Sequence, residues 1–577
     1  MSASKQFDRR SALSVLSSLG VGSLAFQRAL AKEAAEQSVT TAMIADAEWV
    51  AGVKLSEDQR RMAADALAKA QKGLKQFRKE TLDNGLAPAF VFKPLEDERN
   101  PQQEFKQTEV RFRESSVIEK PSSDEDLAML PVSELSALIR TRKVTSSELT
   151  KLYLSRLRRF DPLLKCVVSL TEDLALEQAA KADREIAAGH YRGSLHGIPW
   201  GVKDLFSMPG YRTTWGSPLH KERMLDEKAA VTQSLEDAGA VLLAKLSTGY
   251  YAGGDEWFGG KTRNPWNPSQ GSSGSSAGSG SATAAGLVGF SIGTETMGSI
   301  IAPSERCGVT GLRPTFGRVS RFGCMALSWT LDKIGPICRS VEDCAVVLGA
   351  IHGKDHRDPS SVDRNFAWPV EKNNSAIRIG YEAEDPEFVA EIALLRKLGF
   401  TMVPIELETP EFESMLPIIL TTESGSLFDA LTDKQEPKGV KYWPKTFVMG
   451  QFVTANDYIR ANRIRRRVME KVRDLFRKVD VVVGPSMNIG TNMSGHPKMA
   501  IPRGFIKHKE TGRQVPHALF MTGKLYDEST LLTVANAFQR ATEHHLARPP
   551  IDEFLRDADS FHQDSDLAES DKLYLCE

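Results

Sequence analysis

Residues 271–311 read GSSGSSAGSGSATAAGLVGFSIGTETMGSIIAPSERCGVTG, a stretch rich in glycine and serine. Such composition is typical of a flexible linker, but linkers lack apolar runs like those at residues 287–290 and 307–309. Glycine has no Cβ and tolerates positive φ, so a glycine-rich loop can bring backbone N–H groups against a charged atom. The stretch is therefore a candidate site whose serines are possible nucleophiles. A buried turn region is the alternative from composition alone.

Four segments of this stretch resemble, in order and without gaps, the signature of the amidase signature family of serine amide hydrolases. The family pattern runs roughly GGSSGGS, AAGL, GTDTGGSIR and CGVVGLKPT. The matching segments here are SGSSAGS at 273–279, AAGL at 284–287, GTETMGSI at 293–300 and CGVTGLRPT at 307–315. The match extends outward to residues 262–268 and 332–336. The resemblance implies the amidase-signature fold, an α/β fold with a large mixed β-sheet covered by helices on both faces.

Helix and strand patterns alternate through the rest of the chain, which predicts an α/β sandwich with a large, partly parallel sheet. Residues 135–139 begin one amphipathic helix, and the capping box TSSE at 145–148 begins the next. Further elements are expected as a strand at 377–381, a helix through 394–399, a strand at 402–405, a helix through 458–472 and a strand at 481–483. The three arginines at 465–467 are expected on a solvated helix face.

The 577 residues exceed what one hydrophobic core usually supports, so we expect one large domain with additions. The predicted parts are a signal peptide at 1–31, a helical appendage and linker at 32–125, the amidase signature domain at 126–548 and an acidic tail at 549–577. The appendage is predicted to be helical because a capping box, SEDQ at 56–59, precedes apolar residues at helical spacing.

The N-terminus carries Arg9 and Arg10 before an uncharged, moderately apolar run at 11–26, followed by the small-x-small signal ALA at 29–31. The run is too short and too rich in serine and glycine to span a bilayer stably. The pattern resembles a twin-arginine export signal, which predicts a periplasmic or secreted protein beginning at Lys32. A disordered or amphipathic N-terminus is the alternative.

The 74 basic and 75 acidic residues give a net charge of −1, which becomes −4 if the signal is removed. This balance gives no electrostatic reason to expect nucleic acid as a partner. We expect a small-molecule amide substrate, no cofactor, no metal, no stable membrane insertion after cleavage and, as an open possibility, a homodimer. The six cysteines lack zinc-binding spacing and are expected to be buried hydrophobes.

Amide hydrolysis needs a nucleophile, a group that takes and returns a proton, and donors for the oxyanion. By resemblance, Ser299 lies where the family has its nucleophile, and Lys203 where it has its base. Ser275 lies where the family has a bridging serine, which follows a cis peptide bond. The amides that correspond to the family's oxyanion hole are those of Thr296, Met297, Gly298 and Ser299.

Three residues depart from the family pattern: Glu295 replaces an aspartate, Met297 a glycine and Ile301 an arginine. Backbone donors survive such changes, but Met297 cannot adopt positive φ freely. The expected charged partner of Glu295 is absent unless Arg306 supplies it. These departures make an inactive binding homologue one alternative function.

Lys203 can act as a base only when its amine is neutral. An ordinary lysine has a pKa near 10.4, so only about one in a few thousand is neutral at pH 7. Burial can lower the pKa by roughly 3 units, and the apolar neighbours at 198–200 and 205–206 favour burial. In an extended segment Asp204 points to the opposite face and need not pair with Lys203. Otherwise, the side chain of Lys203 would extend to the surface.

Other interpretations of the site are open. Residues 274–278, GSSAG, also fit the G-x-S-x-G elbow of α/β-hydrolases with Ser276 as nucleophile, but that elbow follows a strand and residues 267–271 are not strand-like. Residues 260–262 resemble the end of a P-loop, but Asp255 occupies a required glycine position. A glutaminase like the A subunit of glutamyl/aspartyl-tRNA amidotransferase is a further alternative, against which the export signal argues.

Overall fold

The computed structural model describes residues 39–77, 83–86, 90–94, 96, 110–112, 118–382, 386–406, 415–432, 443–484 and 488–556. The predicted signal at 1–31 lies outside these residues, as does the predicted tail from 557 onward. The chain forms two compact units. The described part of the smaller unit is residues 39–77, 83 and 452–454, and the larger unit contains the other described residues.

The smaller unit contains two helices, α3 (Thr41–Ala51) and α4 (Glu57–Phe77). The Ser56 hydroxyl accepts a hydrogen bond from the Gln59 amide at 3.3 Å, and the Ser56 amide donates to the Gln59 side chain at 2.8 Å. This is the capping box that the sequence predicts. An ion pair of 2.5 Å between Arg60 and Glu48 joins the two helices.

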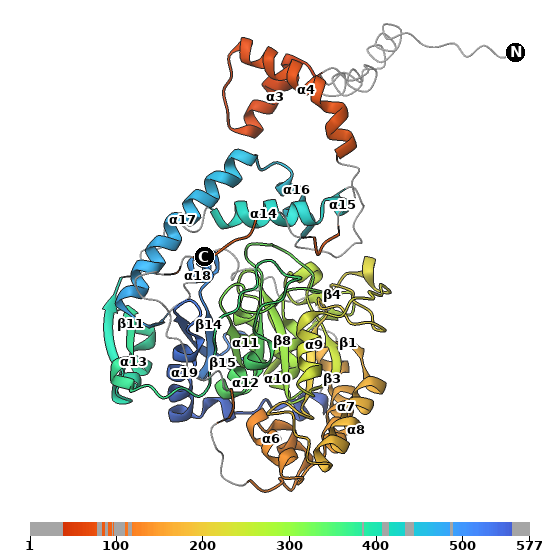
Figure 1. The fold of residues 1–577 in the computed structure, drawn as a ribbon, viewed down its shortest axis with the longest axis vertical. Coiled ribbons are helices and arrows are strands. Elements are labelled where there is room, and N and C mark those ends of the chain that lie inside the picture. Colours follow the sequence, from red (N-terminus) through yellow and green to blue (C-terminus); the bar gives the residue numbers. More distant parts are fainter. Residues whose placement is uncertain are drawn as a thin grey trace, which may run out of the picture. The chain divides into compact units, whose positions relative to one another are not determined.

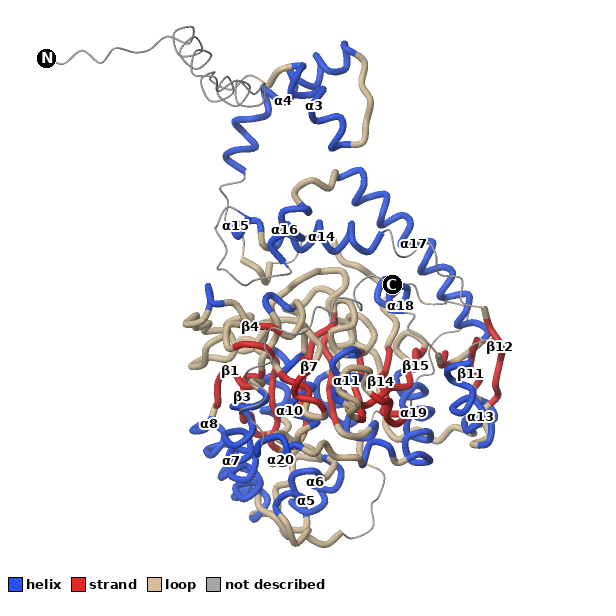
Figure 2. The backbone as a smooth tube through the Cα atoms, turned by 180° about the vertical axis from the view of Figure 1, so that it is seen from behind, coloured by secondary structure: helices blue, strands red, loops and turns tan. Residues whose placement is uncertain are grey.

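The larger unit is built on an eleven-stranded mixed sheet. Its strands, in order across the sheet, are β1 (Val167–Leu170), β3 (Val241–Leu246), β2 (Pro199–Lys203), β8 (Phe290–Glu295), β10 (Lys333–Cys338), β9 (Thr310–Arg313), β14 (Lys498–Lys507), β15 (Gln514–Gly523), β13 (Val481–Val483), β11 (Arg378–Glu382) and β12 (Thr401–Ile405). Strand β2 runs parallel to β3 and β8, and β11 runs parallel to β12 and β13. The other neighbouring strands of the sheet are antiparallel. Figure 2 shows β1 and β12 toward opposite edges.

The helices of this unit are α5 (Asp124–Met129), α6 (Val132–Arg140), α7 (Ser146–Leu164), α8 (Glu172–Ala187), α9 (Ala230–Asp237), α10 (Ala277–Ala284), α11 (Ile301–Cys307), α12 (Val341–Ile351), α13 (Val389–Lys397), α14 (Met415–Leu427), α15 (Asp429–Thr432), α16 (Trp443–Gly450), α17 (Ala455–Lys478), α18 (Asn488–Ser494), α19 (Glu528–Thr542) and α20 (Ile551–Arg556). Thr145 and Glu148 form the predicted capping box of α7. None of the described helices is both long and apolar enough to cross a membrane.

Helices cover both faces of the sheet (Figure 1). On β8, the Ser291 hydroxyl lies 2.8 Å from that of Thr283 on α10, whereas its neighbour Ile292 joins the main apolar core. Successive strand residues point to opposite faces, so α10 and this part of the core lie on different sides of β8. The Trp200 and Phe290 rings stack with centroids 5.8 Å apart. This arrangement confirms the predicted α/β fold with a large mixed sheet.

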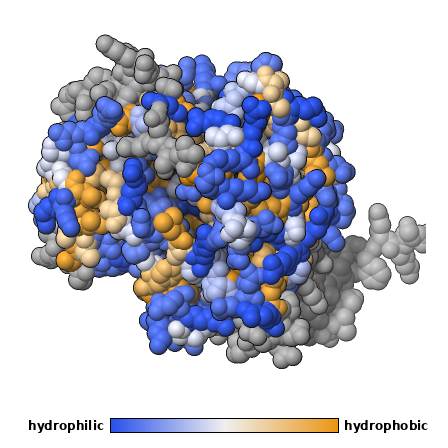
Figure 3. All heavy atoms as spheres, turned by 90° about the horizontal axis from the view of Figure 1, so that it is seen from below, coloured by the Kyte–Doolittle hydropathy of each residue, from blue (hydrophilic) through white to orange (hydrophobic). Residues whose placement is uncertain are grey.

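Hydrophilic residues cover most of the face shown in Figure 3, and apolar residues occur there in small groups. The apolar residues of the main core come from many elements, including α7, α12, α19 and the central strands. Strand β2 is buried along its whole length because it has a neighbour on each side and helices on its faces. Its last residue, Lys203, therefore ends inside the protein.

Two expectations about local structure are wrong. Arg466 and Arg467 are exposed as expected, but Arg465 is buried, because its guanidinium donates to the buried carbonyl oxygens of Met493 and Thr330. Residues 267–271, expected not to be strand-like, form β7 (Asn267–Gly271), which pairs with β6 (Arg263–Asn264) in a separate two-stranded sheet. Strands β4 (Glu256–Trp257) and β5 (Gly260–Lys261) form another small hairpin.

Candidate active site

The Lys203 side chain is fully buried where β2 ends in the middle of the sheet. Its amine nitrogen lies 2.8 Å from the Ser275 hydroxyl, 3.2 Å from that of Ser276 and 2.8 Å from that of Thr294. A neutral amine has two N–H donors and one lone pair, so it can contact three hydroxyls at once, donating hydrogen bonds to two and accepting one from the third. This geometry suits a base.

Burial lowers the pKa of Lys203 to about 7, and nearby Cys324, Asp332 and Glu295 partly oppose this shift. A substantial fraction of the side chain is therefore neutral at physiological pH. Asp204 points away from it and pairs with Lys245 instead, at 2.6 Å with both side chains fully buried. This confirms the prediction that Asp204 points to the opposite face of the segment from Lys203 and does not pair with it.

Ser275 follows a cis peptide bond from Gly274 and is 1% exposed. A Cβ on Gly274 would lie 1.9 Å from the carbonyl oxygen of Gly254, so only glycine fits this close approach of two loops. The next amide, that of Ser276, donates to the carbonyl oxygen of Ser299 at 3.1 Å. This bond brings the loop with Ser275 against the turn with Ser299.

Ser299 lies in the turn between β8 and α11 and is partly exposed. Gly298 before it has a φ of +88°, and a Cβ there would meet no atom within 4 Å. The backbone on that side of Gly298 is thus open, as a loop that receives a substrate oxygen must be. Met297 is outside the left-handed region, so the single positive φ of this turn falls on glycine. The replacement of glycine by Met297 therefore imposes no strain.

Glu295 anchors the start of the same turn. Its carboxylate pairs with Arg313 at 2.8 Å and accepts hydrogen bonds from the amides of Ile300 and Ile301 at 2.9 and 3.1 Å. Burial would raise the pKa of Glu295, but the charge of Arg313, followed by Lys333, lowers it to about 2. The sequence left Glu295 without a charged partner unless Arg306 supplied one, and the structure shows that the partner is Arg313, at the end of β9, which only β10 separates from β8.

Ser276, the nucleophile of the competing elbow hypothesis, is fully buried. Its hydroxyl donates to the Thr294 carbonyl at 3.1 Å and accepts from the Thr294 amide at 3.2 Å. It occupies the N-cap position of α10. The remaining polar partner of the Ser276 hydroxyl is Lys203 rather than a histidine, so the geometry favours a supporting role for Ser276.

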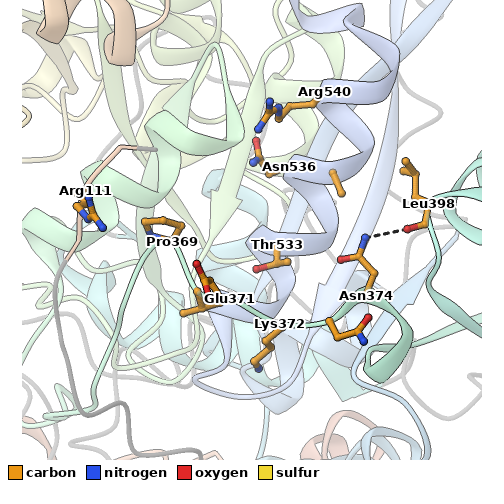
Figure 4. Close-up of a pocket in the computed structure, with 12 residues that line it drawn as sticks. Arg111, Pro369, Glu371, Lys372, Asn374, Leu398, Thr533, Asn536 and Arg540 are labelled. Atoms are coloured by element: carbon orange, nitrogen blue, oxygen red, sulfur yellow. Dashed lines mark hydrogen bonds between the residues drawn. The ribbon is translucent and has the colours of Figure 1, made fainter. Parts of the chain in front are cut away.

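A separate hollow of about 990 Å³ lies beside α19 (Figure 4). Thr533, Asn536 and Arg540 of α19 line it together with residues 369–374. Lys203, Ser275 and Ser299 are absent from its lining, so this hollow is not the candidate active site. The described part of the chain holds no group of three or more His, Cys, Asp or Glu side chains arranged to bind a metal ion.

The amidase family model matches residues 148–522, which include every site residue discussed above. This chain belongs to the amidase family. The A subunit of the glutamyl-tRNA(Gln) amidotransferase of Methylococcus capsulatus is 32% identical over 484 residues, covering 72% of this chain and 98% of that protein. The peptide amidase of Stenotrophomonas maltophilia is 30% identical with a TM-score of 0.63, covering 73% of this chain and 98% of the peptide amidase.

The amidase family and the likeness to peptide amidase make this protein an amide-hydrolysing enzyme. The corresponding amidotransferase protein of Thermotoga maritima, 23% identical with a TM-score of 0.61, shares the fold. Relatives of both kinds match over nearly their full length, so overall similarity does not choose between them. The substrate has to be argued from other observations.

Two residues of this amidase site had no assigned role from the sequence. Thr294 lies in the signature stretch, but its contact with Lys203 depends on the pairing of β2 with β8, with Val202 opposite Ile292. Arg313 is 18 residues from Glu295 in the chain. A single sequence contains no signal for either pairing, because strand register sets both.

Proposed function

We propose that this protein hydrolyses a carboxylic amide to an acid and an amine or ammonia, through an acyl-enzyme on Ser299. The observation that carries the proposal is the buried contact of 2.8 Å between Lys203 and Ser275. The buried lysine has a pKa of about 7, and its hydrogen-bond partners are neutral hydroxyls rather than a carboxylate. Such a group is costly to bury and is typical of an active site.

In the proposed reaction the Ser299 oxygen attacks the amide carbon while its proton passes to Ser275, and the proton of Ser275 passes to Lys203. The backbone amides from Thr296 to Ser299 stabilise the oxyanion. The tetrahedral intermediate then expels the amine, which receives the proton back from Lys203 through Ser275. Water attacks the resulting ester by the same proton path and releases the acid. The chain returns to its starting state without a cofactor.

The proposal extends to location and substrate. Arg9 and Arg10 with the following segment support export to the periplasm, where small diffusible amides are accessible and aminoacyl-tRNA is not. A glutaminase of the amidotransferase kind is the second candidate, supported by 32% identity to the Methylococcus capsulatus protein. A screen of purified protein against aryl amides, fatty amides, peptide amides and glutamine distinguishes the two.

The test of the reaction is a pair of variants. Ser299→Ala removes the nucleophile and lowers kcat by about 10⁴- to 10⁶-fold. Ser276→Ala removes a buried hydroxyl whose three polar contacts, with Lys203 and with the amide and carbonyl of Thr294, stabilise the fold by roughly 1 kcal/mol each, and it should lower turnover only mildly because Ser276 takes no part in the proposed proton transfer. The reverse ranking would contradict the proposal and favour the elbow arrangement.

A further inference from the structure

Residues 327–332 form a turn that lies between residues 296–299, which we call the catalytic loop, and the helices α14 and α17. Most of the side chains of this turn are buried, including Ser328, Thr330 and Asp332. Hydrogen bonds leave it in two directions, toward Thr296 of the catalytic loop and toward Glu423 of α14. We call residues 327–332 the bracing turn.

Asp332 connects the bracing turn to the catalytic loop. One carboxylate oxygen accepts from the Thr296 hydroxyl at 2.6 Å, and the other accepts from the amides of Leu327 and Ser328 at 2.7 and 2.9 Å. All three donors point at one buried carboxylate, and hydrogen bonds to a carboxylate are among the strong ones in proteins. The position of the Thr296 side chain is therefore fixed by the bracing turn.

The backbone carbonyl of Thr296 also has a buried polar partner. The ammonium or amine of Lys333 lies 3.4 Å from the Thr296 carbonyl oxygen and donates to the Asn492 side chain at 2.8 Å. Asn492 belongs to α18, so this contact reaches a different element from that of Asp332. Thr296 is thus restrained both at its hydroxyl and at its carbonyl.

Glu423 connects the bracing turn to the helices. Its carboxylate accepts from the Ser328 hydroxyl at 2.5 Å, from the Thr330 hydroxyl at 2.8 Å and amide at 3.1 Å, and from the Tyr458 hydroxyl of α17 at 2.8 Å. Arg465 of α17 donates to the Thr330 carbonyl and hydroxyl, both at 2.8 Å. Helices α14 and α17 thereby hold one side of the bracing turn, and the catalytic loop is bonded to its other side.

We propose that Asp332 and Glu423 are positioning residues for amide hydrolysis, which act through the bracing turn to fix Thr296 and the backbone amides that follow it. The inference rests on the proposed function, because those amides matter for turnover only if they face the oxyanion. Preorganised donors gain their effect from being in place before charge develops, and a small displacement costs rate rather than substrate binding.

The first test is Thr296→Val, which keeps the backbone amide and the branched shape but removes the hydroxyl that Asp332 binds. We expect kcat to fall about 10- to 100-fold while KM changes by less than about twofold. A trifluoromethyl ketone inhibitor, which forms a tetrahedral adduct, should lose affinity in the same proportion as kcat. An uncharged substrate analogue that cannot react should keep its affinity.

Thr171→Val is the matched control. Thr171 is also buried, and its hydroxyl donates to the Leu242 carbonyl at 2.6 Å, the same length as the bond from Thr296 to Asp332. Both variants should lose thermal stability, Thr296→Val the more because its partner is a carboxylate, but Thr171→Val should keep the wild-type kcat and inhibitor affinity. This comparison separates positioning from a general loss of stability.

Tyr458→Phe tests the helical side, because it removes one donor to Glu423 and leaves the packing of the ring in place. We expect the same signature at smaller size, a fall in kcat of about two- to fivefold with an unchanged KM, because only one of several hydrogen bonds to Glu423 is lost. A wild-type kcat in Thr296→Val, or a change in KM alone, would contradict the proposed positioning role of the bracing turn. If Ser299→Ala also stays active, the proposed function fails. If Ser299→Ala is inactive, only the positioning role of the bracing turn fails.

Discussion

Replacing Lys203 by methionine should stabilise the protein near neutral pH. Methionine fits a site built for a long unbranched chain and carries no charge to desolvate. The wild-type lysine has a pKa of about 7 when folded against 10.5 for the ordinary side chain, a difference of about 3.5 units. At about 1.4 kcal/mol per unit, burying this group costs about 5 kcal/mol when it is ionised in the unfolded chain.

The pH dependence follows from proton binding. Between pH 7 and 10.5 the unfolded chain holds more protons at this position than the folded protein, so the wild type gains stability as pH rises. Lys203→Met removes the free-energy penalty of burying the lysine, which is about 4 kcal/mol at pH 7 and about 2 kcal/mol at pH 9. The hydroxyls of Ser275, Ser276 and Thr294 each lose a partner in the variant, which offsets the gain by roughly 1 kcal/mol each at either pH.

The assay is urea denaturation of both proteins at pH 7, 8 and 9, followed by tryptophan fluorescence. We expect the difference in free energy of unfolding between Lys203→Met and the wild type to shrink by about 2 kcal/mol across this range. The exposed Lys151 of α7 provides a control, since Lys151→Met also replaces a lysine by methionine but at the protein surface. A difference constant with pH for Lys203→Met would refute the assignment of a depressed pKa.

Three further predictions concern the pH dependence of turnover, the ion pair of Glu295 and export. The value of kcat/KM should rise with pH through an apparent pKa of about 7, and Lys203→Arg, which stays protonated, should be inactive; substantial activity there removes the lysine from the mechanism. Arg313→Met leaves Glu295 buried and unpaired and should cost about 3–5 kcal/mol by chemical denaturation, whereas a cost under about 1 kcal/mol would contradict the pairing. Changing Arg9 and Arg10 to lysine should keep the precursor in the cytoplasm, as fractionation would show, while a full-length chain working there normally would contradict export.

The sequence predicts those strands and helices whose own residue pattern specifies their secondary structure. The valines of β13 and the segment of β11 form strands where expected, because each is a short apolar run between helical patterns. The family resemblance places Lys203 and Ser275 in one site, and in the structure the two side chains lie 2.8 Å apart. Local pattern and family resemblance were adequate for these features.

The remaining features depend on contacts between distant segments. The sequence around Arg465 is typical of a charged surface, but its partners are the carbonyl oxygens of Thr330 and Met493. Arg313 rather than Arg306 reaches Glu295 because of strand order, which no local pattern encodes. Charged residues are therefore poorly predicted from local sequence whenever a fold supplies buried polar partners for them.

We propose Ser299 as the nucleophile of an acyl-enzyme, with Ser275 and Lys203 as its proton path. The direct measurement is to react the protein with a serine-directed fluorophosphonate, digest it and locate the adduct by mass spectrometry. We expect one adduct, on the peptide containing Ser299, and no labelling of the Ser299→Ala variant. An adduct on Ser275 or Ser276, or none on an enzyme that is turning over substrate, would contradict it.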